Sequence, residues 1–114
     1  MKVYVASAEK NKKNEVVERL RANGFEVINP WEHQDVVDIF KNDLELVDSC
    51  ELLLCVMPTG GYAYGIICES MYAFLKNIPV YTITNELYKM PLFMKRISKI
   101  ITEESFIQNF KGKT

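Results

Sequence analysis

The stretch from Glu51 to Tyr81 constrains the fold more than any other part of the chain. It begins with a continuous apolar run at 52–57, of the kind found in strands that are covered on both faces of a sheet. A turn with two glycines at 58–61 ends this run, a helical pattern follows at about 65–76, and a second apolar run occupies 78–83. A strand, a turn, a helix and a strand within about thirty residues form a βαβ unit. This unit predicts neighbouring parallel strands joined by a helix.

The rest of the chain repeats the alternation of strands and helices, within a length of 114 residues that suits one domain. The other expected elements are a strand at 2–6, a helix at about 11–23, a strand at 25–28, a helix at about 36–47 capped by Asp35, a short helix at about 87–96, an edge strand at 98–102 and a last helix at 103–110. The pattern predicts an α/β fold, a doubly wound, Rossmann-like parallel sheet of four or five strands in the order 2-1-3-4-5, in three layers. The carboxyl ends of all strands then face one crevice, where such folds bind ligands.

Composition and charge narrow the range of partners. The formal net charge is -1, and lysines and arginines are scattered, which argues against a nucleic acid polymer as the partner. The most basic cluster, Lys10, Lys12 and Lys13, is expected to form a solvated face at the start of the first helix. No apolar run approaches the roughly 18 residues of a membrane span. The first residues lead straight into a strand instead of a signal peptide, so we expect a cytoplasmic protein with no membrane partner.

The cysteines and the histidine indicate neither a disulfide framework nor a metal site. Cys50, Cys55 and Cys68 are odd in number and lie within predicted apolar elements, so we expect reduced core residues. The single His33 has no second histidine and no CxxC motif with which to share a metal ion. The sequence therefore predicts a protein without a bound metal.

Two carboxylates do not fit the pattern of a plain core. Asp43 lies beside Phe40 within the apolar stripe of the second helix, and burying an ionised carboxylate without partners costs several kcal/mol. Glu69 lies one turn into the third helix, on or beside the face that meets the sheet or the crevice. Either acid alone is explained as a residue flanking an apolar face, but both are directed towards one crevice. Two neighbouring carboxyl groups suit a retaining glycosyl transfer, in which one attacks the anomeric carbon and the other positions or exchanges a proton.

Both acids belong to a wider pattern of short segments. The segments are KVYVA at 2–6, KNDL at 41–44, Gly65 ahead of Glu69, Tyr72-Ala73, and KNIPVY at 76–81. In these segments, which cover most of residues 1–83, the chain resembles the nucleoside 2-deoxyribosyltransferase family, including its relatives that hydrolyse deoxynucleoside 5′-monophosphates. The resemblance implies that Glu69 is the nucleophile and forms a covalent 2-deoxyribosyl intermediate. It further implies that Asp43 holds the sugar or the nucleophile in place and that Tyr4 donates a hydrogen bond near the nucleophile.

The resemblance also implies where the substrate binds. Ser7 would lie near the sugar hydroxyl or a 5′-phosphate. The other expected substrate-binding positions are Gly60, Gly61, Tyr62, Ala63 and Gly65. The substrate would be a small (deoxy)nucleoside or nucleotide, with no cofactor, and the chain would form a homo-oligomer through exposed aromatic residues such as Tyr62, Tyr72 and Phe74. In the plainer interpretation, Tyr4 is a packed strand aromatic and Ser7 a loop or cap residue.

Two positions depart from the family pattern. The transferases carry an acid, and the monophosphate hydrolases often a serine, where this chain has Ala63, and Met71 replaces a usual glycine. Tyr62 and Tyr64 flank Ala63 and would either stack on a base or cap the crevice. The missing acid leaves the choice between transfer and hydrolysis open, and it supports an alternative, a non-catalytic nucleotide-binding module on the same fold. A receiver-like domain lacks its phosphoacceptor aspartate here, and a dinucleotide-binding domain lacks its GxGxxG fingerprint.

Overall fold

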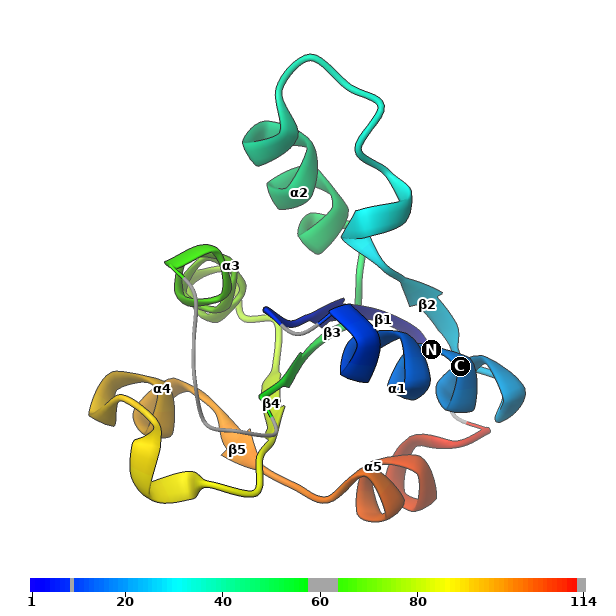
Figure 1. The fold of residues 1–114 in the computed structure, drawn as a ribbon, viewed down its shortest axis with the longest axis vertical. Coiled ribbons are helices and arrows are strands. Elements are labelled where there is room, and N and C mark those ends of the chain that lie inside the picture. The colour runs from blue at the N-terminus through cyan, green and yellow to red at the C-terminus, as the bar shows by residue number, and fades with distance from the viewer. Residues whose placement is uncertain (9, 58–63, 113–114) are drawn as a thin grey trace.

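A five-stranded parallel sheet forms the centre of the computed structural model, which describes residues 1–8, 10–57 and 64–112 (Figure 1). The strands are β1 (Lys2–Ala6), β2 (Glu26–Ile28), β3 (Leu52–Val56), β4 (Val80–Ile83) and β5 (Lys99–Ile100). They lie in the order β2-β1-β3-β4-β5, and each neighbouring pair is parallel. The predicted α/β fold and its strand order 2-1-3-4-5 are therefore confirmed.

Helices cover both faces of the sheet and complete the three layers (Figure 1). The helices are α1 (Lys10–Ala22), α2 (Ile39–Asp48), α3 (Tyr64–Leu75), α4 (Leu92–Ile97) and α5 (Glu103–Phe110), with 3₁₀ turns η1 (Pro30–Glu32) and η2 (Leu87–Lys89). Helices α1 and α5 pack on one face, and α2, α3 and α4 on the other. In the described part of the chain, none of these helices combines the length and the apolar character needed to cross a membrane.

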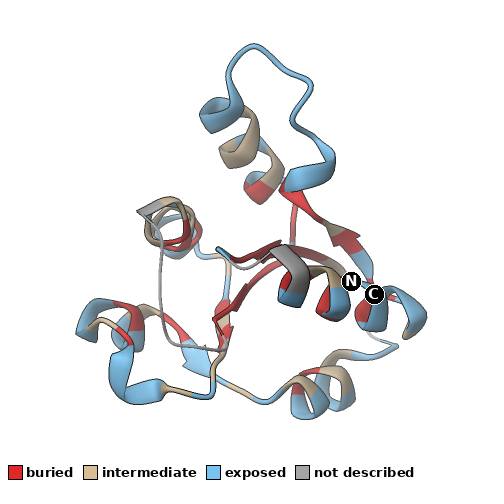
Figure 2. Cartoon of the chain, in the orientation of Figure 1, coloured by how far each residue is buried: buried red, intermediate tan, exposed pale blue. Residues whose placement is uncertain are grey.

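The alternation of side chains along the strands divides the core into two halves. Val3 and Val5 of β1 pack towards α1 and α5, whereas Tyr4 and Ala6 pack towards α2 and α3. Every residue of β3 is buried, as expected of a central strand covered on both faces, and Figure 2 shows the buried residues concentrated in the sheet. The alternation of side chains along β1 thus directs the Tyr4 side chain to the face on which α3 lies.

Helix α2 begins later than its apolar pattern predicts. Asp38 caps it, because its Oδ1 accepts a hydrogen bond of 3.0 Å from the Lys41 backbone N–H, so the predicted cap at Asp35 is wrong. Val37 precedes the helix and is fully exposed, and the Phe40 side chain is 73% exposed. Val37 and Phe40 fit the helical period of the apolar stripe, but nothing in the described part of the chain covers them.

Three further expectations need correction. The helix predicted at 87–96 is interrupted at Pro91, which separates η2 from α4, because proline lacks the N–H that a continuous helix requires. Cys50 and Cys55 are buried and unbridged, but Cys68 is exposed, since it lies on the outer side of α3. The predicted edge strand is shortened to β5.

Candidate active site

A cavity of about 300 Å³ lies where β1 ends and where α1 and α3 begin. Its described lining residues are Ala6, Ser7, Ala8, Lys13, Pro30, Trp31, Gln34, Asp43, Gly65, Ile66 and Glu69. The strands β1 and β3 mark the point at which the strand order reverses, the usual ligand site of doubly wound sheets. The volume lies at the lower end of the range found for small-molecule sites.

Glu69 lines this cavity, and the buried Tyr4 contacts it from the sheet. Glu69 lies in the second turn of α3, and the Tyr4 hydroxyl donates a hydrogen bond to its Oε2. Burial raises the pKa of Glu69 to about 7, the hydrogen bond from Tyr4 and the charge of Lys13 lower it, and the charge of Asp43 raises it. The pKa of Tyr4 is itself raised, chiefly by burial and then by the charge of Glu69, so its phenol stays a neutral donor. The family resemblance implied a hydrogen bond from Tyr4 near the nucleophile, and in the structure Tyr4 donates to Glu69 itself.

Asp43 brings a second carboxyl group to the cavity. It is half-buried on α2, and burial raises its pKa while the charge of Lys13 lowers it. Its Oδ1 is buried and has no hydrogen-bond partner among the described residues. A buried acceptor without a donor is costly, so this oxygen is suited to a hydroxyl of a bound ligand. Residues from two helices, far apart in the sequence, thus meet in one cavity.

Gly65 and Ser7 also line the cavity, as predicted. A Cβ atom added at Gly65 would lie 3.8 Å from Glu69 Oε1, so the glycine leaves free space next to the oxygen that Tyr4 does not contact. Ser7 is buried directly after β1. Gly60, Gly61, Tyr62 and Ala63 fall outside the described residues, and their roles stay predictions.

Lys13 is the site residue that the sequence analysis missed. The side chain expected in solvent has no exposed surface, and it lines the same cavity as both carboxyl groups. Its Nζ lies 4.8 Å from the centroid of the Trp31 ring, within the range of a cation–π contact. A signal for its burial was present, because Lys13 lies three and four residues before Val16 and Val17 on the inward face of α1.

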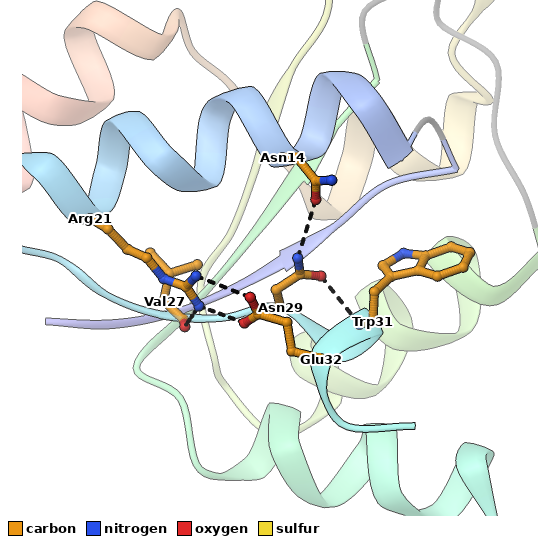
Figure 3. Close-up of polar contacts among 6 residues, drawn as sticks. All are labelled: Asn14, Arg21, Val27, Asn29, Trp31 and Glu32. Carbon is orange, nitrogen blue, oxygen red and sulfur yellow. Dashed lines mark hydrogen bonds and ion pairs between the residues drawn. The ribbon is translucent and has the colours of Figure 1, made fainter. Parts of the chain in front are cut away.

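A network of polar contacts fixes the turn that carries Trp31 against α1 (Figure 3). Asn29 accepts a hydrogen bond of 3.2 Å from the Trp31 backbone N–H and contacts Asn14 of α1 at 3.4 Å. Arg21 of α1 binds both carboxylate oxygens of Glu32, at 2.7 and 3.2 Å. The turn is therefore tied to the helix on both sides of Trp31.

Comparisons with known proteins find solved structures that share this fold. No family model matches the chain, and no curated protein matches it in sequence. A 2-deoxyribosyltransferase from the psychrotolerant bacterium Bacillus psychrosaccharolyticus matches in structure with a TM-score of 0.78 and 20% identity, over 98% of this chain and 93% of that chain. The CMP N-glycosidase BcmB from Clostridium botulinum matches with a TM-score of 0.65 and 19% identity, over 96% and 97%. A conserved protein from Enterococcus faecalis matches with a TM-score of 0.78 and 18% identity, over 100% and 99%.

The TM-scores establish a shared fold over nearly the whole length of each chain, and because the sequence identities are low, they establish the fold alone. The described residues superpose on a scaffold that carries both a deoxyribosyltransferase and an N-glycosidase. A fold does not determine a reaction, so the chemistry has to be argued from the cavity itself.

Proposed function

We propose that this protein cleaves the N-glycosidic bond of a (2-deoxy)nucleoside or its 5′-monophosphate, with Glu69 as the nucleophile, and passes the sugar to water or to another base. The observation that carries the proposal is the meeting of Glu69 and Asp43 at one cavity, with Tyr4 hydrogen-bonded to Glu69. The sequence resemblance to nucleoside 2-deoxyribosyltransferases and the likeness in fold to two enzymes of this chemistry support it.

The geometry around Glu69 suits attack on a sugar carbon. Tyr4 occupies Oε2, which leaves Oε1, on the side kept open by Gly65, to bond the anomeric carbon. As that bond forms, the bond to the base breaks and its electron pair leaves with the base. In the second step, water or another base attacks the same carbon, Glu69 leaves as a carboxylate, and the proton lost by the attacking group balances the one taken up by the departed base. No metal or organic cofactor takes part in these steps.

Asp43 supplies the second half of the proposed chemistry. Its unsatisfied Oδ1 would accept a hydrogen bond from a sugar hydroxyl, and this contact would hold the ring beside Glu69. The carboxylate would also stabilise the positive charge that develops on the sugar in an oxocarbenium-like transition state. Ser7, which is buried directly after β1 and lines the cavity, would contact the same sugar or its 5′ substituent.

Release of free base is the direct test. The purified protein is incubated with deoxynucleosides, ribonucleosides and their 5′-monophosphates, with and without a second base, and the products are separated by chromatography. We expect free base from at least one substrate, and a new nucleoside when a second base is present if the enzyme is a transferase. Saturable nucleotide binding without base release, even at high protein concentration, would instead support the non-catalytic binding module.

We also propose that the chain forms a homo-oligomer, as the family resemblance implies. Several large apolar side chains are exposed before α2, on α2 and on α3, among them Val37, Phe40 and Phe74. Exposed apolar groups of this size are typical of interaction surfaces. Light scattering of the purified protein is expected to give at least twice the chain mass of 13.2 kDa, and a monomer mass at micromolar concentration would contradict this proposal.

A further inference from the structure

Lys13 is fully buried, which is unusual for a lysine and needs a physical reason. Removing an ammonium group from water is costly unless negative charge or a π-system compensates for the lost hydration. The cavity provides both, because the carboxyl groups of Asp43 and Glu69 line it and the Trp31 ring lies 4.8 Å from Nζ. Among the described residues that line the cavity, Lys13 carries the only positive charge.

The surroundings of Lys13 are built to keep it in place. Lys13 comes from α1, on one side of the sheet, whereas Asp43 and Glu69 come from helices on the other side. Its side chain reaches the cavity that they line at the carboxyl end of β1. The network of Figure 3 ties the turn that carries Trp31 to the helix that carries Lys13, so the backbones of the two segments are held side by side.

We propose that Lys13 is a positioning residue, whose buried ammonium supplies the positive charge that faces Asp43 and Glu69 and keeps Glu69 competent as a nucleophile, while Trp31 shields it from water. The inference rests on the proposed function for its catalytic meaning, but the electrostatic relation between Lys13 and Glu69 can be measured without activity.

The surroundings of Glu69 change its pKa in opposite directions. Burial and the charge of Asp43 raise the pKa of Glu69, whereas the Tyr4 hydrogen bond and the charge of Lys13 lower it. Cys55 of β3 also faces Glu69, but burial raises the pKa of its thiol to about 12, so it stays neutral. With a pKa of about 7, Glu69 is charged in only part of the molecules at neutral pH, and loss of Lys13 would reduce that fraction further.

The test is a titration of Glu69 by NMR in protein labelled with ¹³C at the glutamate carboxyl carbon, with the signal assigned from Glu69→Gln. We expect Lys13→Met, which keeps an unbranched side chain but no charge, to move the Glu69 midpoint upward by ~0.5–1 pH unit. Lys13→Arg, which keeps the charge, is expected to leave the midpoint near that of the wild type. Asp43→Asn is expected to move it downward.

The acid limb of the pH–rate profile for base release should move with the titration in the same variants. An unchanged Glu69 midpoint in folded Lys13→Met would overturn the inference. If Lys13→Met does not fold, Lys13→Gln takes its place, with the same expected shift. Absence of base release from the wild type would count against the proposed function alone, because the titration does not depend on activity.

Discussion

Glu69→Gln is expected to lower base release by at least ~10³-fold, which corresponds to roughly 4 kcal/mol in the barrier. Glutamine has nearly the shape of glutamate and still accepts a hydrogen bond from Tyr4, but its amide is too weak a nucleophile to bond the anomeric carbon. Because the change preserves the volume of the side chain, substrate binding should persist. The loss is therefore expected in kcat, with a much smaller change in KM.

A matched control separates the nucleophile from a general effect of charge. Glu104→Gln removes an exposed acid on α5, which does not line the cavity, and is expected to leave the rate of base release unchanged. Mass spectrometry of the wild-type protein quenched during turnover should detect a covalent sugar adduct on the peptide that contains Glu69, and the adduct should be absent from Glu69→Gln. Base release by Glu69→Gln at the wild-type rate would remove Glu69 from the nucleophile role.

The same substitution is expected to stabilise the fold at high pH. Burial raises the pKa of Glu69 from the ordinary 4.5 to about 7, so the folded protein holds the proton more tightly than the unfolded chain. The stability that follows from this is fully present below pH 4.5 and is lost as pH rises through about 7, since the folded state must then bury a charge. At pH 8, Glu69→Gln, which is never charged, should be more stable than the wild type by about 1–3 kcal/mol. The upper value is close to the full shift of the pKa from 4.5 to about 7, which already includes the attraction of Lys13.

Thermal unfolding at a series of pH values measures this difference. The midpoint of Glu69→Gln should exceed that of the wild type by several degrees at pH 8, and the two midpoints should converge towards pH 4.5. Glu104→Gln should follow the wild type throughout. Parallel curves for Glu69→Gln and the wild type at every pH would show that Glu69 is not a destabilised buried acid. If both predictions hold, one residue lowers the stability of the fold and supplies the reaction, a trade-off common at catalytic sites.

Much of the architecture could be predicted because it depends on local patterns and on general rules of chain connection. The apolar run of β3 and the alternation of strands with helices required a parallel sheet, and right-handed crossovers then favoured the observed strand order. The element ends were less accurate at α2, where Val37 and Phe40 satisfied the helical period without being buried. Periodicity shows which residues share a face, but it does not show whether another element covers that face.

The residues of the candidate site could also be predicted only in part. Asp43 and Glu69 were identifiable as acids on otherwise apolar faces, and the family resemblance added Tyr4. The position of Lys13 was not identified, because a cluster of lysines at a helix start ordinarily faces solvent. The spacing to Val16 and Val17 indicated that Lys13 lies on the inward face of α1. The spacing alone did not indicate that the carboxyl groups of two helices from the other face of the sheet line the same cavity.

The sequence by itself determined the order of the elements, the parallel sheet, and the presence of two acids at positions where acids are costly. Only the tertiary structure decided that Lys13 faces these acids, that Tyr4 donates to Glu69, and that burial raises the pKa of Glu69 to about 7. The physical reason is that desolvation and charge–charge interactions depend on distances between side chains of different elements. Those distances are established only when α1, α2 and α3 pack around the end of β1.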